Sequence, residues 1–338
     1  MNKRITYVDY LRVFAAFAVV VLHVSSQKWH DTDVTTGTWA VFNFFDAISR
    51  WCVPVFVMIT GKLVLGRKKS VGYLYSKYVM RAGFAFLFWW VIYALFASGS
   101  VMERLMSIKD QHHVWFIPMI IGLYMVTPFL DKIVEDQKLT RYFLILSFVF
   151  GFVLPELYTL GTDFGGPKVV SLVNAAYVFI SMVEVRLVLG YSFFYVLGYY
   201  LEEVDLEKHS NWIYVVGALS FFTTVALTLV ASRKSLMPSG NYYNNFTVNV
   251  MFEALAVYVW FKNREFKENA VVTSLSKLTL GVYLLHPIIL QQLDARLGVN
   301  VLSWQPAVLV MVLSLGICAV AFVIVKVMSL VPVLKDFV

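Results

Sequence analysis

Charged residues are scarce in this sequence. Asp, Glu, Lys and Arg make up 14% of the 338 residues, whereas 59% of the residues are hydrophobic. Soluble domains carry roughly 25% charged residues, so this chain has too little polar surface to be one. Its long apolar runs recur from one end to the other, which is typical of an integral membrane protein. We therefore expect an all-α, polytopic membrane protein with a single domain over residues 1–338.

Cysteines are few as well. Cys52 and Cys318 are the two in the chain, and both lie inside apolar segments. This usage excludes a disulfide framework and a metal site of the CxxC type, and we expect no bound metal. A clear small-residue cleavage site is missing after the first apolar run, although Lys3 and Arg4 precede that run as they would in a signal peptide. We expect the run to be retained as a helix.

An excess of acidic residues is also absent, because the formal net charge is +7. In membrane proteins surplus Lys and Arg usually gathers in cytoplasmic loops, where it fixes the topology. The positive charge therefore indicates a membrane topology and no nucleic-acid partner.

Ten segments are long enough to span a bilayer, for which about 20 apolar residues are needed. Most Lys and Arg residues fall in the loops on the side of the N-terminus, which predicts that both termini are cytoplasmic. A shorter run, 169–183, is predicted to lie in the interface or to re-enter. The predicted spans are 5–25, 39–65, 78–98, 112–131, 141–158, 186–202, 211–231, 246–262, 276–294 and 304–329.

Two polar residues frame the first apolar run. Arg12 and His23 stand eleven positions apart, with apolar residues alone between them. Eleven steps of about 100° come to three turns plus ~20°, with a rise of about 16 Å, so both side chains lie on one helix face near opposite leaflets. Ionisable groups in membrane helices cost about 2.5–3.5 kcal/mol and usually face a protein interior or a watery cavity. Asp9 is placed to pair with Arg12, although snorkelling of Arg12 and an interfacial cap at His23 are alternatives.

An arginine also lies near the middle of the second predicted span. Arg50 stands in SRWCVPVFVMITG, where Pro54 frees backbone carbonyls. An arginine at that depth needs a partner, and we expect Glu253 in the eighth span to supply it. The pair is either structural or part of a functional site.

Histidines occur at two further places. His112 and His113 open the fourth predicted span beside Trp115, where they are either a membrane belt or site residues. Tyr283 and His286 lie one turn apart in the ninth span, either as satisfied core groups or as part of the same site.

The stretch GRKKS, residues 66–70, begins a cluster of positive charge between the second and third predicted spans. The cluster serves as a topology signal or as a phosphate site for an anionic cytosolic ligand. Its members are Arg67, Lys68, Lys69, Lys77 and Arg81.

Four motifs stand in order over nearly the whole chain. They are Arg-x10-His in the first span, SRWCVPVFVMITG in the second, HHVWFIPMIIGLYMVTP in the fourth and SLSKLTLGVYLLHP near the end. In these motifs the chain resembles the acyltransferase-3 family of bacterial membrane O-acyltransferases. The likeness is strongest to members that O-acetylate surface polysaccharides, of the type that acts on enterobacterial common antigen.

The resemblance implies transfer of an acyl group, most often acetyl, from cytosolic acyl-CoA to a hydroxyl of a surface polysaccharide, an exopolysaccharide or a lipid-linked precursor. It implies that Arg12 and His23 are an essential pair. It also makes Arg67, Lys68 and Lys69 the basic motif, in which many relatives hold arginines where two lysines stand here. The other residues that fall on motif positions are Trp115, Tyr124, Tyr283 and His286.

On this resemblance we expect His23 to act as a general base on the acceptor hydroxyl or to form a transient acyl-histidine. Arg50 or His113 would stabilise the oxyanion, and Trp115 would stack on sugar rings. The remaining members of the expected acceptor pocket are Glu253, Tyr283 and His286.

The expected co-substrate is acetyl-CoA, with no permanently bound cofactor. The expected partners are the glycan acceptor, the lipid bilayer and a second copy of the chain or a biosynthetic complex, and the expected location is the bacterial inner membrane. Succinyl transfer is an alternative. A secondary transporter or exporter of glycan precursors is another, although it predicts two related halves and the sequence shows no internal repeat.

Overall fold

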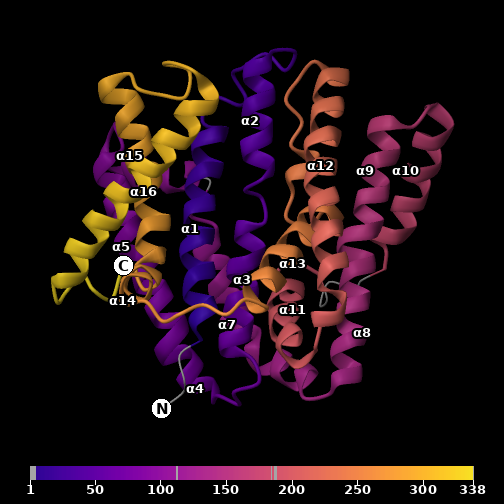
Figure 1. Cartoon of the computed structure of the whole chain (residues 1–338), viewed down its shortest axis with the longest axis horizontal. Helices are drawn as coiled ribbons and strands as arrows, with labels where there is room; N and C mark the ends of the chain where they lie inside the picture. The colour runs from indigo at the N-terminus through magenta and orange to yellow at the C-terminus, as the bar shows by residue number, and fades with distance from the viewer. Residues whose placement is uncertain (1–4, 112, 184, 186–188, 338) are drawn as a thin grey trace. The chain divides into compact units, whose positions relative to one another are not determined.

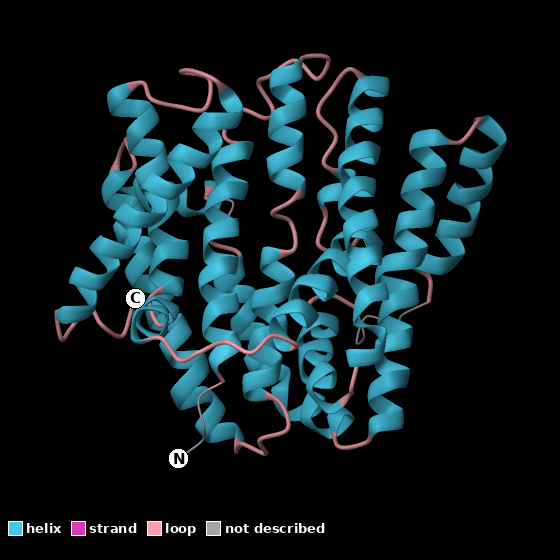
Figure 2. Cartoon of the chain, viewed as in Figure 1, coloured by secondary structure: helices cyan, strands magenta, loops and turns pink. Residues whose placement is uncertain are grey.

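The chain folds into helices that are joined by loops (Figure 2). This computed structural model describes residues 5–111, 113–183, 185 and 189–337, and no strand occurs in those ranges. Within them, seven helical segments are long and apolar enough to cross a membrane, or eight if a bent pair counts as one span. These findings agree with the predicted polytopic, all-helical protein. The count of ten spans and the cytoplasmic termini remain predictions.

The seven segments each overlap a predicted span. They are Thr6–Ser26, Gly37–Val64, Val71–Phe96, Phe116–Val134, Gln137–Phe164, Glu207–Ser235 and Pro306–Leu330. The predicted span 276–294 corresponds to the bent pair, whose helices α14 (Ala270–Ser276) and α15 (Thr279–Leu297) meet at 66°.

The other two predicted spans form shorter helices. The helix α11 (Ser192–Glu203) has 12 residues and α13 (Val248–Lys262) has 15, fewer than the roughly 20 that cross the hydrocarbon. Residues 186–188 of the predicted span 186–202 lie outside the described ranges. The short run at 169–183 forms α10 (Pro167–Ser181), a helix of 15 residues.

The chain divides into two compact units, whose helices are labelled in Figure 1. Unit 1 comprises Met1–Gln27, Arg67–Asp131 and Glu265–Val338, and unit 2 comprises Lys28–Gly66 and Lys132–Arg264. Besides α14 and α15, unit 1 contains α1 (Thr6–Ser26), α4 (Val71–Leu74), the π-helix η1 (Tyr75–Val79), α5 (Met80–Phe96), α6 (Val101–Met106), most of α7 (Phe116–Val134) and α16 (Pro306–Leu330). Unit 2 contains α2 (Gly37–Ala47), α3 (Cys52–Val64), α8 (Gln137–Phe148), α9 (Leu154–Phe164), α10, α11, α12 (Ser210–Ser235) and α13.

In unit 1, the helix α1 packs against α14, α15 and α16. It buries Ala15, Ala16 and Ala18, and small side chains of this kind let membrane helices approach closely. Near the start of α1, Ser276 of α14 donates from its hydroxyl to Asp9 Oδ1 at 2.7 Å. This bond ties α1 to the bent pair.

In unit 2, α3 and α11 touch through their backbones. A Cβ added to Gly61 would lie 1.8 Å from the carbonyl oxygen of Tyr195, and one added to Gly198 would lie 2.0 Å from that of Met58. Only glycine fits at either position, because any side chain would overlap the opposite backbone. The helices α12 and α13 pack beside this pair in the same unit, with α13 against α3.

The predicted span 39–65 is interrupted. The helix α2 ends at Ala47 and α3 begins at Cys52, so Arg50 lies in the turn between two helices and not inside one. Pro54 explains part of the break, because it has no N–H to bond the carbonyl of Arg50. Proline is tolerated there, in the first turn of α3.

Candidate active site

The helix α1 carries both Arg12 and His23 without a break. The helical geometry predicted for this pair is therefore present, with the two side chains on one face and about 16 Å apart along the axis. Both side chains are half-buried. Arg12 is within electrostatic range of Tyr124 in α7, and the ring of His23 lies 6.0 Å from that of His113.

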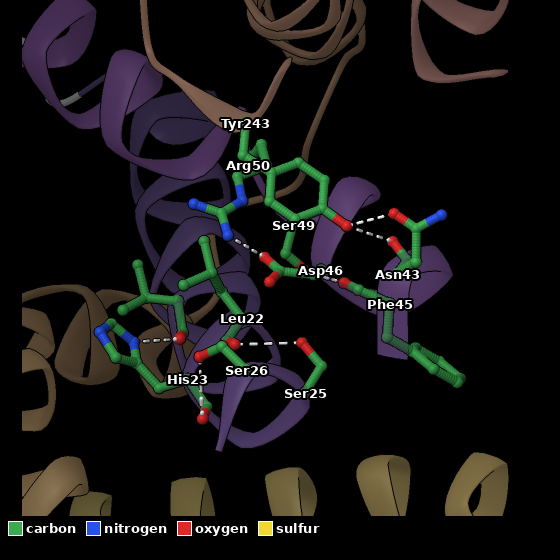
Figure 3. A network of polar contacts seen from close by, with 11 residues as sticks. Leu22, His23, Ser25, Ser26, Asn43, Phe45, Asp46, Ser49, Arg50 and Tyr243 are labelled. Atoms are coloured by element: carbon green, nitrogen blue, oxygen red, sulfur yellow. Dashed lines mark hydrogen bonds and ion pairs between the residues drawn. The ribbon is translucent and has the colours of Figure 1, made fainter. Parts of the chain in front are cut away.

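The imidazole of His23 is oriented by its own helix. His23 Nδ1 lies 2.8 Å from the carbonyl oxygen of Val19, one turn earlier (Figure 3). A carbonyl accepts hydrogen bonds and cannot donate, so Nδ1 carries the proton in this bond. The basic lone pair of the neutral ring is therefore on Nε2.

Three imidazoles gather at this end of α1, and we call His23, His113 and His286 the histidine cluster. Ring centroids are 4.8 Å apart for His23 and His286 and 6.2 Å apart for His113 and His286. They come from α1, from the turn before α7 and from α15. The sequence predicts all three as site residues, and the structure brings them together.

His286 repeats the arrangement of His23. Its Nδ1 lies 3.0 Å from the carbonyl oxygen of Val282, four residues earlier in α15, so its lone pair is also on Nε2. The residue is 0% exposed. Among the described residues, His286 Nε2 has no hydrogen-bond partner.

His113 is held from two sides. The Tyr93 hydroxyl lies 2.6 Å from His113 Nε2 and 2.7 Å from the carbonyl oxygen of Leu284. Since the carbonyl takes the single hydroxyl proton, His113 Nε2 must donate to the Tyr93 oxygen. The hydroxyl of Tyr283 donates to the carbonyl of His113 and so fixes the backbone.

This arrangement bears on the expectation that His113 stabilises an oxyanion. A neutral imidazole has one N–H, and that of His113 is directed to Tyr93. The neutral ring therefore has no second N–H to offer. The structure also differs from the predicted span 112–131, because α7 begins at Phe116 and His113 lies in the turn before it; His112 lies outside the described residues.

Tyr93 is the member of this site that sequence reasoning misses. It stands in the apolar run of α5 and is 3% exposed. The available signal is weak: a buried tyrosine hydroxyl requires a hydrogen-bond partner, but the sequence does not say which. Trp115, which the sequence does single out, is 39% exposed and packs edge-on against Phe116.

A second group of residues lies around Arg12. Tyr124 of α7 is within electrostatic reach of Arg12 and of Arg81, and its ring centroid is 5.1 Å from that of Tyr78. Lys69 donates from Nζ to the Tyr78 hydroxyl at 2.6 Å. Arg12 is thus connected through two tyrosines to the cluster of positive charge predicted from residues 66–70.

That cluster is exposed and locally constrained. Arg67, Lys68, Lys77 and Arg81 are exposed, and Lys69 is half-buried. Lys68 adopts a φ of 46°, an uncommon left-handed conformation for a lysine. The following helix contains a π-turn, η1, and π-turns inside helices are frequent at functional sites.

Arg50 and Glu253 belong to unit 2 and interact electrostatically as predicted, but the ion pair of Arg50 is formed with another carboxylate. Arg50 Nη2 lies 2.6 Å from Oδ1 of the buried Asp46, four residues earlier. Its guanidinium carbon lies 4.1 Å from the centroid of the Tyr243 ring (Figure 3). Glu253 Oε1 instead accepts from the Thr224 hydroxyl at 2.5 Å.

Apart from Trp115, the expected site residues form three groups: the histidine cluster with Tyr283, the group of Asp9, Arg12 and the basic residues, and the unit 2 residues Arg50 and Glu253. Among the described residues no set of three or more His, Cys, Asp or Glu side chains is arranged to hold a metal ion. The chemistry available at the histidine cluster is proton transfer and hydrogen bonding at imidazole nitrogens.

Residues 5–325 match the family model described as an acyltransferase domain. An amino-acid racemase of Enterococcus faecalis is 26% identical over 320 residues, which cover 86% of this chain and 42% of that protein, so the chain spans less than half of that relative. No solved structure matches the chain. Because the family model covers nearly the whole chain, this protein belongs to the acyltransferase-3 family of acyl-transferring enzymes.

Proposed function

We propose that this protein transfers an acetyl group from acetyl-CoA to a hydroxyl of a cell-surface polysaccharide or its lipid-linked precursor. The observation that carries the proposal is the orientation of His23, whose Nδ1–H is bound to Val19 so that the basic Nε2 is presented in the histidine cluster. We also propose that the enzyme is of the type that acetylates enterobacterial common antigen. Its proposed location is the bacterial inner membrane.

The donor would dock by its phosphates on the basic residues. Arg67, Lys68, Lys77 and Arg81 are exposed, and exposed cations of this density attract a polyanion such as coenzyme A. Lys69 is held against Tyr78, which positions its charge beside the route to Arg12. The pantetheine arm would then follow α1 from Arg12 toward His23.

The transfer step needs one base. The acceptor hydroxyl gives its proton to His23 Nε2 while its oxygen attacks the thioester carbonyl carbon, so that a C–O bond forms. When the C–S bond breaks, the thiolate of coenzyme A takes the proton from His23. The Val19 carbonyl stabilises the imidazolium meanwhile, because it accepts from Nδ1–H. The acyl-histidine route uses the same nitrogen as nucleophile.

Two further elements of the proposal concern the oxyanion and the partners. The N–H of neutral His113 is directed to Tyr93, so the neutral ring has no N–H left for the oxyanion. Trp115, 39% exposed, offers an aromatic face to a sugar. A second copy of the chain or a biosynthetic complex is proposed as a protein partner.

The racemase name describes a much longer protein, and nothing in the described residues favours racemisation here.

The experiment follows labelled acetyl from acetyl-CoA into the host's polysaccharide in membrane vesicles, with equal amounts of each variant inserted. We expect His23→Ala and Arg12→Ala to abolish transfer, and His209→Ala, at an exposed histidine, to leave it unchanged. Wild-type rates in both site variants would sink the proposal. Succinyl-CoA in place of acetyl-CoA tests the alternative acyl group, and substrate counterflow in liposomes without acyl-CoA tests the transporter.

A further inference from the structure

One polar atom of the histidine cluster, His286 Nε2, has no role in the proposed transfer step. His286 Nε2 is buried in a residue that is 0% exposed and has no hydrogen-bond partner among the described residues. The Val282 carbonyl holds Nδ1, so Nε2 is an acceptor and cannot donate while the ring is neutral. A buried acceptor without a partner is costly. A hydrogen-bond donor on a bound ligand would remove this cost.

The position of His286 Nε2 limits which hydrogen-bond donors the ligand can carry. The ring of His286 lies 4.8 Å from that of His23, the base of the proposed reaction. Both rings are oriented by the carbonyl four residues earlier. In the proposed step the reacting hydroxyl gives its proton to His23, whose ring is next to that of His286, so a ligand that also donates to His286 Nε2 needs a second hydrogen-bond donor beside that hydroxyl.

The two histidines differ in accessibility. His23 is half-buried, whereas His286 is fully buried, and the rings of His113 and Tyr283 also lie near that of His286. The base must take the proton of the reacting hydroxyl and later give it to the thiolate of coenzyme A, which favours the more accessible His23 for that task. His286 is then left to hold the acceptor.

We infer that His286 Nε2 accepts a hydrogen bond from the hydroxyl next to the one that is acylated, so that the acceptor is a sugar with two hydroxyls on adjacent carbons. This inference rests on the proposed function. No covalent step involves His286. Its role is to fix the reacting hydroxyl against His23, and to decide which hydroxyl of the sugar reacts.

Two substitutions separate the two nitrogens of His286. In His286→Asn, the amide N–H takes the place of Nδ1–H and keeps the bond to Val282, but no acceptor remains at Nε2. In His286→Gln, the longer side chain places an amide oxygen near the position of Nε2. We expect His286→Asn to lower kcat/KM for the host polysaccharide roughly 10- to 100-fold, and His286→Gln to recover part of that loss.

Three readouts distinguish a substrate contact from a merely structural role. The KM for acetyl-CoA should stay at the wild-type value in His286→Asn, and the pH profile should keep its shape, because the base is unchanged. The acetylated product should show a mixture of positions by NMR where the wild-type product shows one. Wild-type kcat/KM and a single position in His286→Asn would overturn the inference.

The wild-type product provides a test that needs no variant, in case both substitutions prevent insertion. NMR of the acetylated polysaccharide should place the acetyl group on a carbon whose neighbour carries a hydroxyl. An acetyl group on a primary hydroxyl beside the ring-oxygen carbon would contradict the inference. Failure of the proposed function has a different signature, namely transfer that survives His23→Ala.

Discussion

Replacement of Tyr93 by Phe removes a single oxygen that two elements of unit 1 share. The Tyr93 hydroxyl accepts from His113 Nε2–H and donates to the Leu284 carbonyl, at 2.6 and 2.7 Å. The phenylalanine ring fills the same volume, so no cavity forms. The change therefore isolates the two hydrogen bonds from the packing around them.

The size of the effect follows from the burial of His113. This residue is 4% exposed, so its N–H, once directed to Tyr93, is left in an apolar environment. A buried donor without a partner costs about 1–3 kcal/mol, while hydrogen bonds between membrane helices average about 0.6 kcal/mol. We expect Tyr93→Phe to lower the free energy of unfolding by about 1–3 kcal/mol, nearer the upper end if His113 cannot reorient.

Equilibrium unfolding in mixed detergent–SDS micelles measures this difference. Tyr142→Phe is the matched control, because Tyr142 is 59% exposed. A double variant of Tyr93→Phe with His113→Phe should lose less than the sum of the two single losses, since both remove the same bond. If Tyr93→Phe is as stable as Tyr142→Phe, the assignment of the His113 proton is wrong.

Three further perturbations test other parts of the structure. Gly198→Ala places a Cβ 2.0 Å from the Met58 carbonyl oxygen, and we expect a loss of about 1–3 kcal/mol in unfolding free energy from overpacking. Asp46→Asn removes the charge that faces Arg50 at 2.6 Å; we expect a loss of up to about 3 kcal/mol, the low end for buried pairs because the Arg50 side chain is 22% exposed. Lys69→Ala removes a cation of the proposed donor site and should raise the KM for acetyl-CoA roughly tenfold, with a weaker dependence on salt.

Each of these has a matched control in the chain. Gly316→Ala should be nearly neutral, since a Cβ there meets nothing within 4 Å. Lys132→Ala breaks the ion pair with Glu135, in which the lysine side chain is 75% exposed, so it should cost at most about 0.5 kcal/mol. Lys208→Ala, at an exposed lysine, should leave the KM for acetyl-CoA unchanged. A test variant that behaves like its control contradicts the reasoning for that residue.

Helical periodicity explains which parts of the site the sequence can predict. Arg12 and His23 lie on one helix, so their relative direction depends only on the number of residues between them. The residues around them come from other helices. Tyr93 of α5 and the Leu284 carbonyl of α15 meet at His113 because of how the helices pack, and an apolar run does not say which helix it will face.

The ion-pair partner of Arg50 also shows what cannot be predicted from the sequence. The sequence offers Glu253 as an acidic residue in a membrane segment, and the pairing is plausible by charge alone. The structure ends α2 at Ala47 and restarts at Cys52, so the turn brings Arg50 back onto Asp46. A partner four residues away needs less ordering of the chain than one about two hundred residues away. Predicting this pair requires predicting the helix break first.

Helix geometry also determines which ring nitrogen carries the proton in His23 and His286. His23 and His286 each bond the carbonyl four residues earlier through Nδ1, and in each case that carbonyl lies on the side chain's own helix. The proton is therefore assigned by a contact within the histidine's own helix, and Nε2 is left basic in both rings. His113 lies in a turn, and Tyr93 fixes its tautomer from another helix. Substitution of Tyr93 in α5 should therefore change the tautomer of His113, while the Nδ1–H tautomers of His23 and His286 stay the same.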